Sequence, residues 1–218
     1  MRSPLYRSGL LFRAAMHLLH GPGLDRKYAH ICSFISPGDR VLDLGCGTGT
    51  LQSHLKGNYY LGLEMNDDFV AYAKKKGRNV LKQNVLGFGR FSDFDVCVMM
   101  DVLHHVNPRH VELVEKVLAS VRKIVIISEP FDMPNRHGAL RRMARVLDDD
   151  GINASREWMD KESLIRFYEK YGPERIDEIS SSMIAVYRNW GSQKDRGAIS
   201  GLPVGNRAQK SIKNLKRA

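Results

Sequence analysis

The residues best suited to chemistry are an acid and three closely spaced glycines, Asp43, Gly45, Gly47 and Gly49. Glycine has no Cβ and tolerates positive φ angles, so alternate glycines allow the backbone to turn sharply and lie against a ligand. The hydrophobic residues before Gly45 indicate a short buried strand, and the leucines after Gly49 have helical spacing. A glycine turn between a strand and a helix is the nucleotide-binding unit of doubly wound α/β folds.

The spacing of these glycines argues against a dinucleotide ligand. A dinucleotide-binding turn needs a Gly or Ala three residues after its second glycine, and here that position is Thr50. An acid two residues ahead of alternating glycines resembles motif I of the class I S-adenosylmethionine-dependent methyltransferases. An acid at this position suits a ligand that carries an ammonium and a sulfonium group rather than phosphates. The resemblance therefore implies that residues 41–50 bind S-adenosylmethionine.

Further donor-binding residues follow from this resemblance. Glu64 closes the second predicted strand 21 residues after Asp43, where an acid can accept hydrogen bonds from ribose hydroxyls. Met65 then offers an apolar surface for adenine. Asn84 replaces an acid that often binds the adenine amino group in family members, and its amide oxygen is still an acceptor. The predicted donor site comprises Asp43, Gly45, Cys46, Gly47, Thr48, Gly49, Glu64, Met65, Asn84, Val85 and Met100.

Residues 101–106 follow the fourth predicted strand, and ligands of open α/β sheets bind beyond the carboxyl ends of the strands. Their sequence resembles the corresponding motif of small-molecule methyltransferases. The Pro-Pro-aromatic sequence of many enzymes that methylate amino groups of DNA or RNA is absent. A hydroxyl acceptor needs a base that works near neutral pH, and histidine fits. Neighbouring side chains point in different directions, so His104 and His105 cannot have the same role. The resemblance implies that His104, whose position varies among relatives, is the catalytic base and that His105 is structural.

The remaining patterns predict an α/β fold. Short hydrophobic segments alternate with helical patterns, and the strands are expected at residues 41–44, 59–63, 79–82, 94–100, 123–128, 174–179 and 183–188. The last two strands are expected to be an antiparallel pair. The resemblance implies a doubly wound, seven-stranded, mostly parallel Rossmann-like sheet. Asn107 and Pro108 predict the N-cap and first turn of a helix that ends near Ser120.

The chain divides into three parts by composition and periodicity. Residues 1–35 have helical spacing and predict an N-terminal helical cap. Residues 36–190 are expected to form the methyltransferase domain. Residues 191–218 lose periodicity and predict a disordered basic tail. At 218 residues the chain has room for one domain with a sizeable core.

The net charge of +10 resides mainly at the two ends of the chain. The last 28 residues carry seven Lys or Arg and one acid, a charge of +6, and the first 23 carry three Arg and no acid, which leaves +1 for residues 24–190. The two ends are therefore the candidate contacts with a membrane surface or with nucleic acid.

Other features of the sequence indicate a cytoplasmic protein without a metal cofactor. No apolar run is long enough for a transmembrane segment, and arginines interrupt the N-terminus where a secretory signal would be apolar. The three cysteines have no metal-ligand spacing and are expected to be reduced thiols.

Three functions are consistent with these observations. The first is methyl transfer from S-adenosylmethionine to a small organic or lipid-like acceptor, by in-line displacement. The second is methylation of RNA or protein, with the basic tail as an anchor. The third is a methyltransferase-fold binding module without turnover, and the intact glycine motif argues against it.

Overall fold

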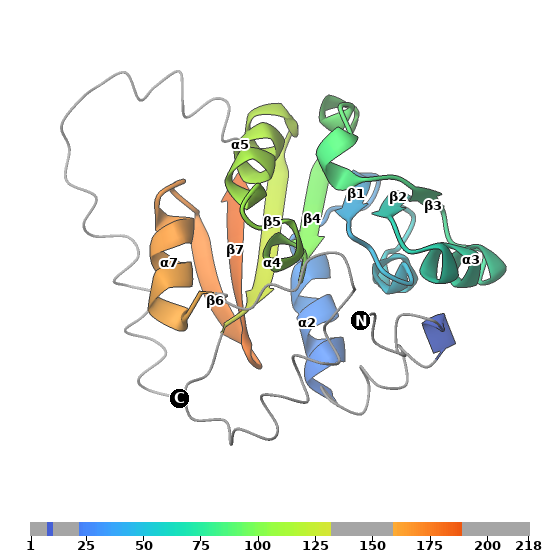
Figure 1. Cartoon of the computed structure of the whole chain (residues 1–218), viewed down its shortest axis with the longest axis horizontal. Helices are drawn as coiled ribbons and strands as arrows, with labels where there is room; N and C mark the ends of the chain where they lie inside the picture. The colour runs from blue at the N-terminus through green and yellow to red at the C-terminus, as the bar shows by residue number, and fades with distance from the viewer. Residues whose placement is uncertain (1–7, 11–21, 132–158, 189–218) are drawn as a thin grey trace.

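The computed structural model describes residues 8–10, 22–131 and 159–188. Most of these residues belong to one seven-stranded sheet, whose strands run from β3 to β6 across Figure 1 in the order β3-β2-β1-β4-β5-β7-β6. The strands are β1 (Arg40–Leu44), β2 (Tyr59–Glu64), β3 (Val80–Lys82), β4 (Val96–Met100), β5 (Ile124–Pro130), β6 (Arg175–Ile179) and β7 (Ser182–Arg188). Each lies within two residues of the bounds expected from the sequence.

The first five strands are parallel, and β7 pairs antiparallel with both β5 and β6. The chain proceeds outward from β1 to β2 and β3, and then returns to the other side of β1 with β4. This reversal places a topological switch point between β1 and β4, where open α/β sheets bind their ligands. The predicted fold class, a doubly wound and mostly parallel seven-stranded sheet, is confirmed.

Helices cover both faces of the sheet. On one face, Leu42 and Leu44 belong to the core that includes residues of α5 (His110–Ser120) and α7 (Lys161–Glu169). On the other face, Val41 belongs to the core that includes residues of α2 (Pro22–Cys32) and α3 (Asp67–Lys75). Because side chains alternate along a strand, Asp43 lies on the same face as Val41. The acid of the glycine motif is therefore on the α2 side of the sheet.

Two helix predictions need correction. The helix expected after the glycines is a short 3₁₀ helix, η2 (Thr50–His54), because the chain becomes extended at Leu55 and enters β2 soon afterwards. Asn107 and Pro108 do not begin α5. A short helix, α4 (Leu103–Val106), precedes them, and Asn107 is its C-cap. The helix α5 starts after Arg109, whose N–H donates to the carbonyl of Val106 at 2.8 Å.

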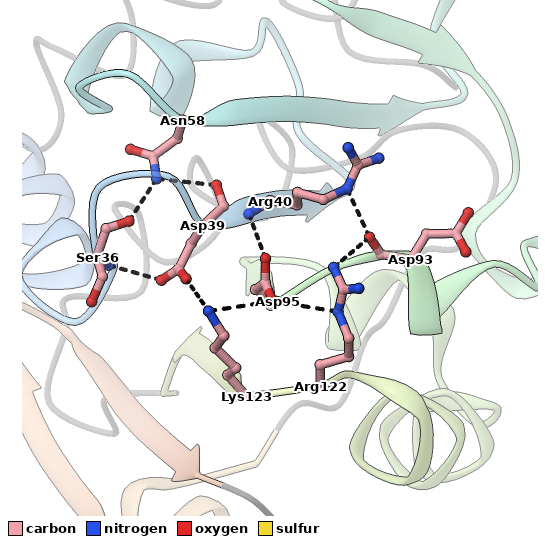
Figure 2. Close-up of polar contacts among 8 residues, drawn as sticks. All are labelled: Ser36, Asp39, Arg40, Asn58, Asp93, Asp95, Arg122 and Lys123. Carbon is pink, nitrogen blue, oxygen red and sulfur yellow. Dashed lines mark hydrogen bonds and ion pairs between the residues drawn. The ribbon is translucent and has the colours of Figure 1, made fainter.

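The edge of the sheet where the parallel strands begin is held by a charged cluster, drawn in Figure 2. Asp39, just before β1, is 3 % exposed and accepts a 2.7 Å hydrogen bond from Nζ of Lys123. Asp95, just before β4, accepts from the backbone N–H of Arg40 at 3.0 Å and lies 3.3 Å from Arg122. These contacts join the starts of β1, β4 and β5, which leaves the opposite edge for ligands.

Several predicted features lie outside the described residues. They include most of the predicted cap before residue 22 and the tail from residue 191. Of the predicted cap, the structure describes α2, which packs on the sheet. The boundaries of the cap and tail remain predictions. No helix among the described residues is long and apolar enough to span a membrane.

Candidate active site

The three motif glycines adopt the backbone conformation for which glycine is suited. Gly45, Gly47 and Gly49 have φ angles of +64°, +54° and +69°, in the left-handed region that other residues rarely adopt. A Cβ on Gly45 would lie 2.6 Å from Cγ2 of Val102, in the segment that follows β4. The loop after β1 is thus packed directly against the segment after β4, at the topological switch point.

Contacts from β2 and from Arg78, two residues before β3, hold this loop in place. The N–H of Cys46 donates to the carbonyl of Leu63 at 3.0 Å. The guanidinium of Arg78 donates to the carbonyl of Thr48 at 2.6 Å and to the hydroxyl of Ser53 at 3.0 Å. Thr48 is itself buried. Cys46 and Thr48, both predicted to bind the donor, therefore lie in a loop with a defined conformation. Arg78, which is outside the motif, supports this loop.

Glu64 lies beside the glycine loop. Its Oε2 accepts from the N–H of Gly47 at 2.9 Å, and its Oε1 accepts from the N–H groups of Met65 and Asn66, both at 2.8 Å. Burial raises the pKa of this carboxyl, and the three N–H donors oppose that effect. A carboxylate has about four lone-pair positions, so these contacts leave about one for a ribose hydroxyl. The structure brings the two most specific parts of the predicted donor site together.

Asp43 is 3 % exposed, and its Oδ2 accepts a 2.8 Å hydrogen bond from the hydroxyl of Tyr60. Burial raises the pKa of Asp43 to about 7; the hydrogen bond from Tyr60 lowers it, and the charge of Glu64 raises it further. Burial and the charge of Asp43 also raise the pKa of the nearby Cys46 thiol well above its usual value. Cys46 is therefore a neutral thiol rather than a nucleophile.

The helix α2 contributes two residues that the sequence analysis did not identify. Nζ of Lys27 lies 2.7 and 2.9 Å from the two carboxylate oxygens of Asp101, at the end of β4, and 3.1 Å from the hydroxyl of Ser182 in β7. The ring of Tyr28 stacks on His54, with 4.7 Å between centroids. No feature of the sequence distinguishes Lys27 from the other lysines. Its partner Asp101 has a φ of +58°, which is uncommon for an aspartate.

The two adjacent histidines occupy different environments. His104 is 5 % exposed, and its Nδ1 lies 2.7 Å from Oε2 of Glu129 in β5. His105 is half-buried, and a proton on its ring would oppose the rise in the pKa of Glu64 that burial causes. The two rings are 4.1 Å apart between centroids. Glu129 was also missed, although an acid near the end of a predicted strand is the same signal that identified Glu64.

The remaining predicted residues lie at the carboxyl ends of strands, as expected for ligand contacts. Met65 directly follows β2 and is 45 % exposed, and Met100 ends β4 and is half-buried. Asn84 follows β3, and its Oδ1 accepts from the N–H of Leu86 at 2.9 Å, as the N-cap of η3 (Val85–Gly87). The side chain of Val85 is buried. The adenine-binding role of Asn84 stays a prediction, and its observed contact is a local cap.

The chemistry of these groups fits S-adenosylmethionine. Two carboxyl groups lie at the glycine loop, because Asp43 is two residues before Gly45 and Glu64 accepts from the N–H of Gly47. Such a set can attract the ammonium and sulfonium groups and hold ribose hydroxyls. In the part of the chain that the structure describes, no cluster of three His, Cys, Asp or Glu side chains is arranged to bind a metal ion.

Known structures share this fold. The magnesium protoporphyrin IX methyltransferase of Synechocystis PCC 6803, crystallised with bound SAH, matches 76 % of this chain and 83 % of its own, with a TM-score of 0.56 and 16 % identity. A methyltransferase of Thermotoga maritima, described as a possible histamine N-methyltransferase, matches 81 % of this chain and 94 % of its own, with a TM-score of 0.56 and 15 % identity. At these identities the likeness shows the fold.

A sequence relative adds a further comparison. The ribosomal protein L11 methyltransferase of Thermotoga neapolitana is 28 % identical over 135 residues, which is 57 % of this chain and 48 % of the relative. The chain thus spans about half the length of this curated relative.

The sheet order, with a glycine loop after β1 and an acid at the end of β2, defines the fold of the class I S-adenosylmethionine-dependent methyltransferases. The family model described as methionine biosynthesis protein MetW matches residues 25–143, more than half of the chain. The chain belongs to the MetW family.

Proposed function

We propose that this protein transfers the methyl group of S-adenosylmethionine to a small organic or lipid-like acceptor. The observation that carries the donor assignment is the 2.9 Å hydrogen bond between the N–H of Gly47 and Oε2 of Glu64. It joins the glycine loop and the acid of β2 in one site at the topological switch point. When bound, the donor supplies a methyl group already activated by its sulfonium.

The residues of the chain then have to bind and orient the two substrates. The glycine loop and Glu64 hold the donor, and Asp43 favours its positive charge. Placement of the acceptor in line with the methyl group can contribute about 7–11 kcal/mol to lowering the barrier. Where the acceptor is a hydroxyl, His104 takes its proton.

The charge distribution supports a small acceptor. Residues 24–190 carry a net charge of only +1, whereas a nucleic-acid enzyme is expected to present a broad basic face.

The donor assignment is tested by calorimetry with S-adenosylmethionine and, separately, with NAD. Binding of NAD without binding of S-adenosylmethionine would overturn it.

The acceptor is tested by incubating the full chain with a cell extract and radiolabelled donor. Label is then measured in separated lipid, small-molecule, RNA and protein fractions. We expect label in the lipid or small-molecule fractions. Label confined to RNA or protein would contradict the small-acceptor proposal and leave the donor assignment intact.

A macromolecular acceptor is the second candidate. It is favoured by the basic ends and by the relative from Thermotoga neapolitana, whose name describes a ribosomal protein as its substrate. If the tail binds RNA, its lysines and arginines release counterions, so methylation should weaken steeply with salt. A chain ending at Asn189 should then lose salt-sensitive RNA methylation while it retains donor binding. Unchanged turnover of a soluble acceptor after truncation would favour the first candidate.

A further inference from the structure

Glu129 is a fully buried acid whose two oxygens have different partners. Oε1 accepts from the backbone N–H groups of Val102 and Leu103, both at 2.7 Å, and Oε2 lies 2.7 Å from Nδ1 of His104. One carboxyl group therefore contacts three consecutive residues of the segment that follows β4. Through Val102, this segment is packed against Gly45 of the donor loop.

We propose that Glu129 is a positioning residue that fixes the ring orientation and tautomer of His104 for proton transfer. This inference rests on the proposed function, in which His104 is the base. As a carboxylate, Glu129 can only accept hydrogen bonds, so the ring nitrogen that faces it carries a proton. A neutral imidazole has one N–H, so the basic lone pair is then on Nε2.

The backbone contacts make this orientation rigid. Two backbone N–H groups hold the side chain of Glu129, and a backbone N–H can donate a hydrogen bond but cannot accept one. Oε2 of Glu129 is consequently directed toward His104, the residue that follows Val102 and Leu103 in the chain. The ring of His104 is 5 % exposed, so packing also restricts its rotation. The arrangement places the basic lone pair on Nε2, which is itself a buried atom, rather than on Nδ1.

The tautomer can be measured without knowing the acceptor. Long-range ¹H–¹⁵N NMR spectra of the ¹⁵N-histidine-labelled full chain, saturated with S-adenosylhomocysteine, distinguish Nδ1–H from Nε2–H rings. His104 is one of eight histidines, and its signals are assigned as those lost in His104→Gln. We expect neutral His104 to be protonated at Nδ1. A wild-type ring protonated at Nε2 would overturn the proposal without recourse to any variant at Glu129.

Glu129→Gln tests the cause of this preference. The amide oxygen can still accept from Val102 and Leu103, which places the amide NH₂ group toward His104. Because NH₂ only donates, Nδ1 must become the acceptor, and we expect the proton to move to Nε2. An unchanged tautomer in the folded variant would contradict the assigned role.

A matched control is Asp39→Asn at the opposite edge of the sheet. Asp39 is also buried and also accepts a backbone hydrogen bond, from Ser36 at 2.9 Å. This variant should lower stability and leave the His104 tautomer unchanged. A change of tautomer in the control would show that the signal reports general loosening, which would also overturn the proposal.

Activity provides the second readout once labelling has identified an acceptor. Glu129→Gln should lower kcat roughly 10²–10⁴-fold, the usual contribution of a general base, with little change in the KM for the donor. A changed tautomer with an unchanged kcat would contradict a positioning role. Calorimetry separates this outcome from failure of the proposed function, because a wild-type chain that does not bind the donor would refute the proposed function whatever the tautomer of His104.

Discussion

The hydroxyl of Tyr60 in β2 donates a 2.8 Å hydrogen bond to Oδ2 of Asp43 in β1, and both groups are buried. Tyr60 is a neutral partner, so it stabilises the ionised acid without neutralising its charge. Burial, which raises the pKa of Asp43 to about 7, outweighs this hydrogen bond. The acid of the glycine motif therefore changes its charge close to neutral pH.

We predict that the affinity for S-adenosylmethionine rises with pH up to about 7. Below this pH Asp43 is protonated, whereas a cationic donor favours the ionised form, so binding must release a proton. The dissociation constant should fall by up to about tenfold for each unit of pH between 5 and 7, and should then level off. Calorimetry in buffers of different ionisation enthalpy measures both the affinity and the released proton.

Two variants test whether Asp43 is the group whose titration causes this pH dependence. Asp43→Asn should bind the donor weakly and without this pH dependence. Tyr60→Phe removes the hydrogen bond that lowers the pKa of Asp43, so it should move the midpoint to higher pH. A proton release that persists in Asp43→Asn would assign the titration to a different group.

Glu64 provides a second prediction on the donor. Glu64→Gln removes the charge that strengthens hydrogen bonds to ribose, and charge-assisted bonds contribute about 1.5–3 kcal/mol each. Exchange of one such bond for a neutral one, which contributes about 0.5–1.5 kcal/mol, should weaken donor binding by roughly five- to tenfold. Glu112→Gln is the control, because Glu112 is an exposed acid of α5 that pairs with Arg109 at 3.0 Å. Equal affinities in wild type and Glu64→Gln would show that Glu64 only holds the backbone of the loop.

The fold was largely predictable, and candidate donor-binding residues could be named, because both depend on local patterns. Hydrophobic strands, glycines at alternate positions and an acid that closes β2 are all visible in short stretches of sequence. Contacts between distant residues have no such pattern. Lys27 and Asp101 are 74 positions apart, and His104 and Glu129 are 25 apart, so only the assembled sheet reveals their pairing. Likewise, Asn107 followed by Pro108 looks like a helix start until α4 is seen to occupy the preceding residues.

A substitution at Gly45 tests whether the close approach of the glycine loop to Val102 is required for stability. Gly45→Ala places a Cβ 2.6 Å from Cγ2 of Val102 at a φ of +64°, which combines backbone strain with a clash. Gly57→Ala is the matched control, because its φ is +74° and no atom lies within 4 Å of the added Cβ. We expect the control to lose about 1–2 kcal/mol of stability and Gly45→Ala to lose more.

The clash and the strain at Gly45 can be separated. Gly45→Ala combined with Val102→Ala removes the contact and retains the positive φ, so part of the stability should return relative to the additive expectation. Denaturant unfolding measures the free energies. Equal losses in Gly45→Ala and Gly57→Ala would contradict the importance of the contact with Val102.

The ion pair between Lys27 and Asp101 provides the last prediction, because it joins α2 to the end of β4. Their side chains are 7 % and 29 % exposed, so the pair is mostly removed from water. Lys27→Met should lower the free energy of unfolding by about 3 kcal/mol, the lower end of the range for a buried pair that loses one partner, since water can reach Asp101. Lys82→Met is the control, because Lys82 forms an equally short 2.7 Å ion pair with Asp67 at 57 % and 75 % exposure. The control should change stability by less than about 1 kcal/mol, the usual value for surface pairs. Urea unfolding at low and high salt measures both variants. Equal losses in the two variants would show that burial does not strengthen the attachment of α2 to the edge of the sheet where the donor site lies.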